Sequence, residues 1–326
     1  MSSYNFHPAM TALSPPLLDG PPRLFAMVTT LKSRGYTPYA LHSFFDTTAL
    51  RSQDRFVLIN NDDPALDELA APYKAHISVE HNSSPRSFAA NANSMISQAV
   101  DSGMDLFFMN NDIIFTDNWL APLTGNPKTI LSPISNREVQ YAGSTIIPKT
   151  QEVTQLVVTE APMALEDYLS APRMYQAIAE SHQKIASGLM RLIVFPFFCV
   201  RLPLAVMQRV GKFDEGFGRA GGEDYDYCLR AWLSGFDVHM ALASYLIHFW
   251  GKSTWSSDSQ QQTPSYNTDF LEVFRAKWGE ALFQYTLREN DSLIKAHAEA
   301  ARLRDTGDLG GMVRVLMDHP VETFLP

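Results

Sequence analysis

The strongest constraint on the fold is a short apolar segment that ends abruptly in polar side chains, within Asp105–Trp119 (DLFFMNNDIIFTDNW). Leu106–Met109 is wholly apolar, which predicts a strand buried on both faces. It is followed at once by Asn110, Asn111 and Asp112. In an open α/β sheet, ligands bind at the carboxyl ends of the strands. A carboxylate and two amides there offer hard oxygen ligands for Mg²⁺ or Mn²⁺ shared with a diphosphate, although a polar turn explains the same residues equally well.

Further apolar runs alternate with segments of helical periodicity. This alternation predicts an α/β fold with a mostly parallel, twisted central sheet and flanking helices. No glycine-rich dinucleotide-binding turn or phosphate-binding loop follows the first strand, which argues against a Rossmann dehydrogenase or a P-loop kinase. The expected strands are Leu24–Thr30, Arg55–Asn60, His76–Glu80, Thr129–Pro133, Ser144–Pro148, Ile193–Val200 and Phe236–Met240. Ala243–Phe249 is a further apolar segment, and it carries His248. The expected helices in this part are Thr37–Leu50, Ala65–Ala71, Phe88–Val100 and Tyr225–Ser234.

The composition excludes several classes of protein. The 326 residues are 45% hydrophobic and carry a net charge of −9, which argues against a general nucleic-acid binder because such a protein needs a basic face. Cys199 and Cys228 form no Cys-x-x-Cys pair and no apolar leader precedes them, so we expect free thiols and a cytoplasmic location. The most apolar region, Leu189–Met207, is broken by Arg and Pro, so no transmembrane segment is expected, and peripheral membrane contact is left open.

The second informative stretch is Val210–Trp255, in which two glycines precede a group of acids. The Gly-Gly pair stands directly before Glu223 and Asp224, and a helix is expected to follow. Carboxylates are favoured at a helix N-terminus, so Asp224 and Asp226 are either functional acids or helix caps, with Asp226 the better cap. For His248, which lies in an aromatic segment, a buried hydrogen-bonded histidine is the ordinary alternative to a metal ligand.

Several of these segments resemble family-two glycosyltransferases of the GT-A fold. FDEGFGRAGGEDYDYCLRAWLSGF resembles the family segment that reads roughly Phe-Asp-Glu-x-Phe and then Gly-Glu-Asp-x-Asp. LFFMNNDIIFTDNWL resembles the strand with the metal-binding DxD motif, and SFAANANSMI resembles a helix with a recurrent Asn, here Asn93. His248 with Gly251 and Ser253 resembles the histidine-containing metal segment, and KWG at Lys277–Gly279 also recurs in the family.

The resemblance implies an enzyme that transfers a sugar from a nucleotide-diphosphate sugar to a hydroxyl acceptor, such as a glycan or a lipid-linked saccharide. It also implies a divalent metal, Mn²⁺ or Mg²⁺, and usually inversion at the anomeric carbon. A retaining transferase of the same fold and a non-catalytic nucleotide-sugar-binding scaffold are the alternatives. The implied organisation has three parts, an irregular arm at 1–22, a GT-A domain at 23–262 and a helical C-terminal extension at 263–326. Within the GT-A domain we expect a donor half at about 23–125, a helical insertion at about 151–191 and an acceptor half at about 192–262.

The resemblance implies roles for individual residues as well. Asp112 and His248 would hold the metal. Asp224 would be the general base that takes the proton of the attacking hydroxyl, and Glu223 would orient the acceptor or the loop. At Asn60 the family usually carries an Asp that contacts the nucleobase. The residues expected to contact the nucleotide are Thr29, Asn60, Asp62, Arg86 (phosphate), Asn93, Asn110 (ribose or metal-bound water) and Asn111. Turn chemistry is the competing explanation for Thr29, Asn60, Asp62 and Asn93, and a solvated loop charge is the alternative for Arg86.

Overall fold

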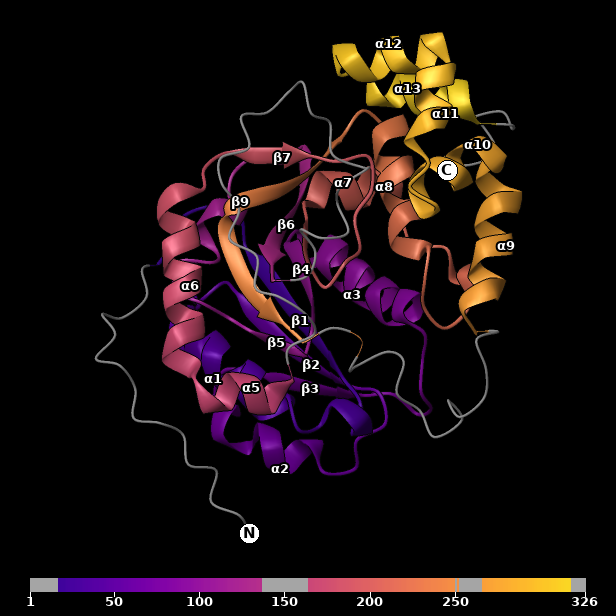
Figure 1. Ribbon diagram of the computed structural model, residues 1–326. Coiled ribbons are helices and arrows are strands. Elements are labelled where there is room, and N and C mark those ends of the chain that lie inside the picture. Colours follow the sequence, from indigo (N-terminus) through magenta and orange to yellow (C-terminus); the bar gives the residue numbers. More distant parts are fainter. Residues whose placement is uncertain (1–16, 137–163, 250, 252–265, 318–326) are drawn as a thin grey trace.

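A mixed β-sheet runs through the centre of the protein (Figure 1). The structure is a computed structural model that describes residues 17–136, 164–249, 251 and 266–317. Among these residues the strands follow the order β3-β2-β1-β4-β8-β6-β9-β5, and β7 pairs with β9. The strands are β1 Arg23–Thr29, β2 Arg55–Asn60, β3 Ser78–His81, β4 Asp105–Asn110, β5 Ile113–Ile114, β6 Thr129–Ser135, β7 Leu189–Arg191, β8 Cys199–Leu202 and β9 Asp237–His248.

The half of the sheet built first along the chain is parallel, as expected. β1 pairs in parallel with both β2 and β4, and β2 pairs in parallel with β3. β8 runs antiparallel between β4 and β6, whereas β6 is parallel to β9. β5 and β7 are antiparallel to β9. Most strands therefore point the same way, and the carboxyl ends of β1, β2 and β4 meet at one edge, where ligands bind in such sheets.

Helices cover both faces of the sheet, which explains why its central strands are apolar throughout. The helices are α1 Thr37–Thr47, α2 Leu66–Ala70, α3 Phe88–Ser102, α5 Leu165–Ser170, α6 Pro172–Ile185, α7 Leu204–Val210, α8 Glu223–Leu233, α9 Tyr266–Trp278, α10 Glu280–Leu287, α11 Asp291–Ala296, α12 Ala298–Thr306 and α13 Leu309–Leu316. Strand side chains alternate between faces. Leu24 and Leu106 join the core under α3, α7 and α8, whereas Phe25 and Phe107 join the core under α1 and α2. Burial of each such side chain stabilises the fold by roughly 1.5–3 kcal/mol.

One expected strand is wrong over most of its length. Ile193–Val200 was expected to be a strand, but β8 begins only at Cys199, and residues 193–198 form no strand ladder although most of them are buried. Pro196 has no N–H to donate to a neighbouring strand. A short apolar run by itself does not distinguish a buried strand from buried irregular chain, which is the physical reason for the error.

Other boundaries shift by smaller amounts. Phe236–Met240 and Ala243–Phe249 join into the single long strand β9. The helix expected from Tyr225 begins at Glu223, so both acids after the glycine pair lie in its first turn. The expectations that lie outside the described residues concern Ser144–Pro148, Ser253, residues 1–16 of the arm and residues 151–163 of the insertion.

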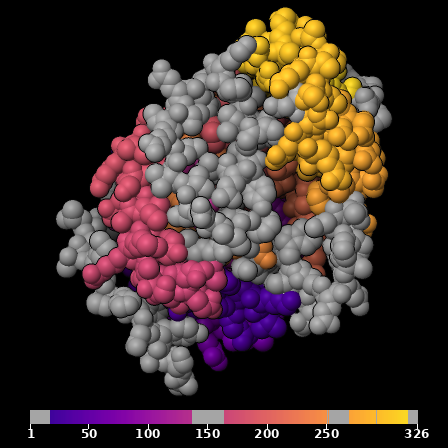
Figure 2. All heavy atoms as spheres, in the orientation of Figure 1, coloured from indigo at the N-terminus to yellow at the C-terminus, as the bar shows by residue number. Residues whose placement is uncertain are grey.

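The helices that follow α9 pack beside α8 (Figure 1). Close approach of α13 to α8 depends on Gly310, because a Cβ atom there would lie 2.7 Å from the carbonyl oxygen of Trp232. Arg314 also donates to the carbonyl oxygen of Leu233 (3.0 Å). Helices α5 and α6 lie on the other side of the molecule from the C-terminal helices (Figure 2). Here α6 packs on β9. Within the described residues, no helix combines the length and apolar character needed to cross a membrane.

Candidate functional site

A carboxylate and an imidazole face each other beyond the carboxyl end of β4. Asp112 follows β4, and His248 ends β9, where it pairs with Ile113 of β5. The Oδ1 atom of Asp112 lies 3.6 Å from Nε2 of His248, and their side chains are 0% and 3% exposed. The N–H of Phe249 donates to the carbonyl oxygen of Asp112 (2.9 Å). The structure thus brings together the two residues expected at a metal site.

His248 is held through both its main chain and its ring. Its N–H donates to Oδ1 of Asn136 (2.8 Å), and Nδ2 of Asn136 donates to its carbonyl oxygen (3.2 Å). The imidazole stacks on Phe198 with ring centroids 4.7 Å apart and planes inclined by 14°. These contacts fix the plane of the ring, so that Nε2 is directed toward Asp112.

The Asp112–His248 pair fits a divalent cation held by two protein side chains. Neighbouring ligands at ~2.1 Å from a cation lie roughly 3 Å apart, which is close to the observed separation of 3.6 Å. In the part of the chain that the structure describes, no group of three His, Cys, Asp or Glu side chains could hold a metal. Mg²⁺-type sites with few protein ligands are completed by water and substrate phosphates. The donor set therefore suits a cation shared with a phosphorylated ligand and does not suit a four-ligand structural zinc site.

The second acidic group stands at the start of α8. Gly221 and Gly222 precede it with φ angles of 118° and 81°, which favour glycine. Glu223 accepts a hydrogen bond from the N–H of Gly221 (2.5 Å) and is 4% exposed. Asp224 is partly buried and accepts from the N–H of Phe197 (3.2 Å) and from that of Tyr225 (2.8 Å). Two adjacent carboxylates are therefore held in one turn with little water around them.

This crowding changes the acidity of both carboxyl groups. Burial raises the pKa of Glu223 to about 8, and the neighbouring Asp224 adds to the effect. Burial also raises the pKa of Asp224 to about 6, although the hydrogen bonds from the N–H groups of Tyr225 and Phe197 lower this pKa. Because like charges this close disfavour double ionisation, the pair titrates in two coupled steps. Near neutral pH the pair therefore resists carrying two full negative charges.

Two consecutive phenylalanines, Phe197 and Phe198, contact the Glu223–Asp224 pair and the Asp112–His248 pair. The N–H of Phe197 donates to Asp224, while the ring of Phe198 stacks on His248. The carbonyl oxygen of Phe198 also accepts from the main-chain N–H of Asn110 (2.8 Å), directly before the polar end of β4. The Asp112–His248 pair and the Glu223–Asp224 pair therefore lie on either side of one short segment of chain.

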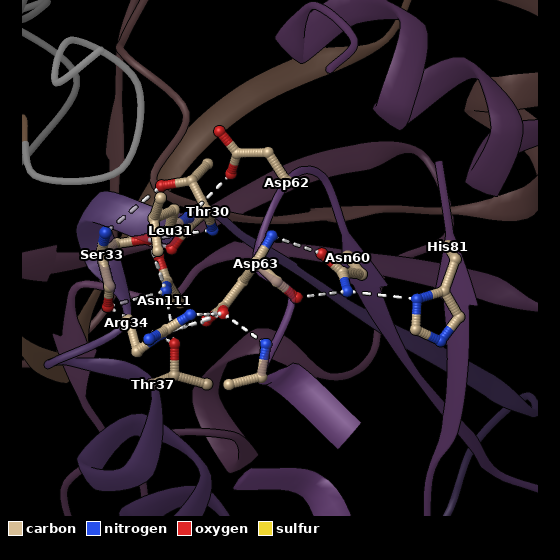
Figure 3. Close-up of polar contacts among 11 residues, drawn as sticks. Thr30, Leu31, Ser33, Arg34, Thr37, Asn60, Asp62, Asp63, His81 and Asn111 are labelled. Carbon is tan, nitrogen blue, oxygen red and sulfur yellow. Dashed lines mark hydrogen bonds and ion pairs between the residues drawn. The ribbon is translucent and has the colours of Figure 1, made fainter. Parts of the chain in front are cut away.

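Three of the expected nucleotide contacts have side chains engaged within the protein, and Figure 3 shows two of them, Asn60 and Asn111. Thr29 donates to the carbonyl oxygen of Ile59 (2.9 Å). Asn60 donates to the carbonyl oxygen of Asp63 (2.7 Å) and accepts from its N–H (2.8 Å). Asn111 is fully buried, and its Nδ2 donates at 2.8 Å to each of two hydroxyls, those of Ser33 and Thr37. These side chains shape the turns after β1 and β2, and their contact with a nucleotide stays a prediction.

Asp62 and Arg86 are the exposed members of the expected nucleotide set. One carboxylate oxygen of Asp62 accepts from the N–H of Leu31 (2.7 Å), and the other points away from the turn (Figure 3). The main chain of Arg86 is fixed by Asn61, whose Oδ1 accepts its N–H (2.8 Å). An acid and a guanidinium group are therefore available at the edge formed by the carboxyl ends of β1 and β2.

Asn93 lies instead inside the protein. It is 5% exposed, and its amide donates to the carbonyl oxygen of Phe213 (3.0 Å) and to Glu215 (2.9 Å). Its Oδ1 accepts from the N–H of Phe213 (2.7 Å). Asn93 thus ties α3 to the loop that leads to Glu223, and the structure gives it no described contact with the carboxyl edge of the sheet.

Comparison with known proteins identifies the fold. No family model and no curated protein matches the chain. Among solved structures, GalNAc-T7 with UDP, GalNAc and Mn²⁺ is similar to it, with a TM-score of 0.53 and 12% identity over 85% of this chain. The chain has the GT-A glycosyltransferase fold.

The match covers only part of GalNAc-T7, because this chain spans 55% of the length of that chain. Two further structures are similar at lower scores. They are the mannosyltransferase PcManGT from Pyrobaculum calidifontis in complex with GDP-Man and Mn²⁺ (TM-score 0.48, 10% identity, 90% of this chain and 73% of that chain) and S. aureus TarS (TM-score 0.49, 12% identity, 88% of this chain and 43% of that chain).

A tyrosine that was not identified from the sequence lies beside the Asp112–His248 pair. The ring of Tyr36 packs on Phe249, with centroids 5.1 Å apart. Burial raises the pKa of its hydroxyl, and the carboxylates of Glu166 and Asp112 add to the effect, so all three groups share one electrostatic environment. Glu166 belongs to α5, so this helix lies close enough to affect the hydroxyl of Tyr36. Nothing in the local pattern around Tyr36 marked it, because its partners lie far away in the sequence.

Proposed function

We propose that the protein is a metal-dependent glycosyltransferase that moves a sugar from a nucleotide-diphosphate sugar to a hydroxyl group. The observation that carries the proposal is that Phe197 and Phe198 border both the Asp112–His248 pair and Asp224. A donor bound across this segment would have its diphosphate at Asp112 and its sugar toward Asp224. One ligand would then meet a cation site at one end and a base at the other.

Asp112 and His248 are the residues that would hold the cation. A bound Mn²⁺ or Mg²⁺ would supply positive charge to offset the negative charge that develops on the departing diphosphate. The chain's own contribution is orientation, because Phe198 and Asn136 fix His248 before any ligand binds. The burial of both side chains also lowers the local dielectric constant, which strengthens electrostatic interactions in the site.

Asp224 would take the proton of the acceptor. The acceptor oxygen forms a bond to the anomeric carbon while the bond from that carbon to the diphosphate oxygen breaks. The hydroxyl proton passes to the carboxylate of Asp224, and the nucleoside diphosphate leaves with the electron pair. Burial raises the pKa of Glu223, which favours its protonated form, and in that form Glu223 would donate a hydrogen bond to the acceptor. A base on the acceptor side supports a single displacement, which inverts the anomeric carbon.

A nucleoside diphosphate is the donor class that the site supports best. GalNAc-T7, which shares the fold, holds UDP and Mn²⁺ in its solved structure. In this chain the outward-pointing oxygen of Asp62 could accept an N–H of a nucleobase, and the exposed Arg86 could contact a phosphate. Thr29, Asn60 and Asn111 would act indirectly by holding the turns that form the pocket.

A thermal-shift panel of uridine, guanosine and thymidine diphosphates with Mn²⁺ tests this function. We expect one nucleotide to raise the melting temperature by several degrees, because a ligand at 100 times its Kd stabilises by about 2.7 kcal/mol. EDTA should remove the shift. No shift with any nucleotide in the presence of Mn²⁺ would overturn the proposal.

Two product measurements separate the proposal from its alternatives. The anomeric configuration of the product, read by proton NMR, distinguishes an inverting from a retaining transferase. A nucleotide-sugar-binding scaffold would give the thermal shift without release of nucleoside diphosphate from the donor. We expect release that depends on Asp224 and a product of inverted configuration.

A further inference from the structure

The last residues of α9 reach under the acid pair from the C-terminal extension. Asp226, which is fully buried, accepts the ammonium group of Lys277 (2.7 Å) and the indole N–H of Trp278 (3.0 Å) on Oδ1. Its Oδ2 accepts Nε of Arg230 (2.8 Å). A buried carboxylate two residues after Asp224 is thus neutralised in part by a helix far away in the sequence.

Lys277 ties a second segment to the same point. Its ammonium group lies 2.6 Å from Oδ2 of Asp214 and 5.5 Å from the centre of the Phe217 ring. Asp214 in turn caps the short 3-10 helix Glu215–Phe217 through the N–H of Gly216 (2.8 Å). Lys277 therefore joins α8 to the loop that approaches it from the N-terminal side.

The same helix also closes the space beside the two glycines. A Cβ atom at Gly221 would lie 2.8 Å from the ring of Phe270, and one at Gly222 would lie 3.0 Å from that ring and 3.1 Å from the Phe217 ring. Both glycines have positive φ angles, so the turn needs glycine for its backbone as well as for its packing. Phe270 belongs to α9, so one helix contacts the turn before the acids and the carboxylate after them.

We propose that Lys277 and Trp278 are positioning residues for Glu223 and Asp224, which makes the C-terminal extension a working part of the transfer site. This inference rests on the proposed function of Asp224 as the base. Neither residue needs to touch the substrate: Lys277 and Trp278 hold Asp226 and thereby the first turn of α8, and Phe270 holds the turn before it.

Charge gives the arrangement a measurable consequence. The charged and titratable groups around the acid pair are Asp226, Arg230 and Cys228 on α8, Asp214 on the preceding loop and Lys277 on α9. The negative charge of Asp226 favours the protonated forms of Glu223 and Asp224, and the cations on Asp226 oppose this effect. Loss of Lys277 should therefore make Asp224 a weaker acid, and loss of Asp226 should make it a stronger one.

The test compares pH profiles of kcat/KM for Lys277→Met, Lys277→Arg, Asp226→Asn and the double variant Asp226→Asn/Lys277→Met. For Lys277→Met we expect the midpoint of the acidic limb to move up by about one pH unit. At pH values below that midpoint, kcat/KM should therefore fall by about tenfold. Asp226→Asn should move it down, the double variant should return toward wild type, and Lys277→Arg should restore it. Trp278→Phe, which keeps the ring and loses the N–H, should lower kcat more than it changes KM. Lys295→Met, an exposed lysine of α11, is the matched control.

A second readout keeps this inference distinct from the proposed function. The carboxyl signal of Asp224 in protein labelled with ¹³C-aspartate gives its titration midpoint without donor or acceptor, so it reports even if no nucleotide binds. An upward shift in Lys277→Met that the double variant reverses supports the inference. An unchanged midpoint, with kcat/KM lowered by the same factor at every pH, would overturn it and leave Lys277 as a stabilising residue only.

Discussion

Asn93 and Phe213 lie 120 positions apart and exchange a pair of hydrogen bonds, at 2.7 Å from the N–H of Phe213 to Oδ1 and at 3.0 Å from Nδ2 to its carbonyl oxygen. The residue expected from the sequence to contact the nucleotide is thus engaged in fastening α3 to the loop before the acids. A polar side chain can thus serve a site by holding neighbouring segments of the chain in place.

Replacing Asn93 should mainly reduce stability. Asn93→Ala leaves the buried N–H and carbonyl of Phe213 without this partner, so we expect a loss of about 2–3 kcal/mol in the free energy of unfolding. Urea denaturation measures it, with Asp101→Ala, an exposed residue of the same helix, as the control. Unchanged stability combined with a large rise in the nucleotide Kd would instead favour direct contact.

Removing the carboxylate of Asp112 should abolish metal-dependent nucleotide binding. Asp112→Asn keeps the shape of the side chain but loses the charge that a divalent cation needs. We expect the shift in melting temperature produced by nucleotide with Mn²⁺ to disappear, and His248→Ala to weaken it. Asp46→Asn, an exposed acid on α1, should retain the full shift. A normal Mn²⁺-dependent shift in Asp112→Asn would place the cation elsewhere.

The acidity of Asp224 predicts the pH dependence of turnover. Because the base must be ionised and burial raises its pKa to about 6, kcat/KM should rise through about pH 6 and level off above it. Asp224→Asn should reduce kcat by about 10²–10⁴-fold, the usual contribution of a general base. Initial rates of nucleoside diphosphate release between about pH 5 and about pH 8, from about one unit below the pKa to about two units above it, measure both effects. Wild-type rates in Asp224→Asn would exclude this residue as the base.

The raised pKa values of the acid pair should also lower the free energy of unfolding as the pH rises. The folded protein binds the Asp224 proton more tightly than the unfolded chain, so stability falls as pH rises from the ordinary value of 3.8 through about 6. The window for Glu223 runs from 4.5 to about 8. At pH 8 we expect Asp224→Asn to be more stable than wild type by about 2 kcal/mol. The raised pKa would be contradicted if wild type and Asp224→Asn had the same free energy of unfolding at pH 8 as well as at pH 5. The control is Asp269→Asn, which changes an exposed acid of α9.

The glycine turn should not tolerate a side chain. Gly221→Ala would bring Cβ to 2.8 Å from Phe270 at a φ angle that alanine rarely adopts, so we expect both destabilisation and displacement of the acids. Gly35→Ala, where nothing lies within 4 Å, should be neutral. Thermal melting and kcat measure the two effects. If Gly221→Ala were as stable and active as Gly35→Ala, the contact with α9 would have no importance.

The first strands and the position of Asp112 could be predicted because the information is local. Strands buried on both faces read as apolar runs, and the polar residues that end β2 and β4 mark where the runs stop. The error at Ile193–Val200 arose because an apolar run is also compatible with buried irregular chain, and only the missing N–H of Pro196 pointed against a strand.

The engagement of polar side chains could not be predicted, since it depends on partners distant in sequence. Asn111 looks like a metal-site amide until the hydroxyls of Ser33 and Thr37 are seen to hold it. Lys277 and Trp278 were visible as a recurrent KWG, but their contact with Asp226 appears only once α9 is folded against α8.

The direction of a single strand determines where Phe197 and Phe198 come to lie. β8 is inserted in reverse between β4 and β6, so the chain begins β8 at the edge of the sheet where β4 finishes. Four residues of strand span about 13 Å, and a β8 of the opposite polarity would carry the two phenylalanines to the far edge. The reversal therefore brings the two phenylalanines to the edge where β4 ends, and it makes the topology of the sheet itself a determinant of which side chains can meet there.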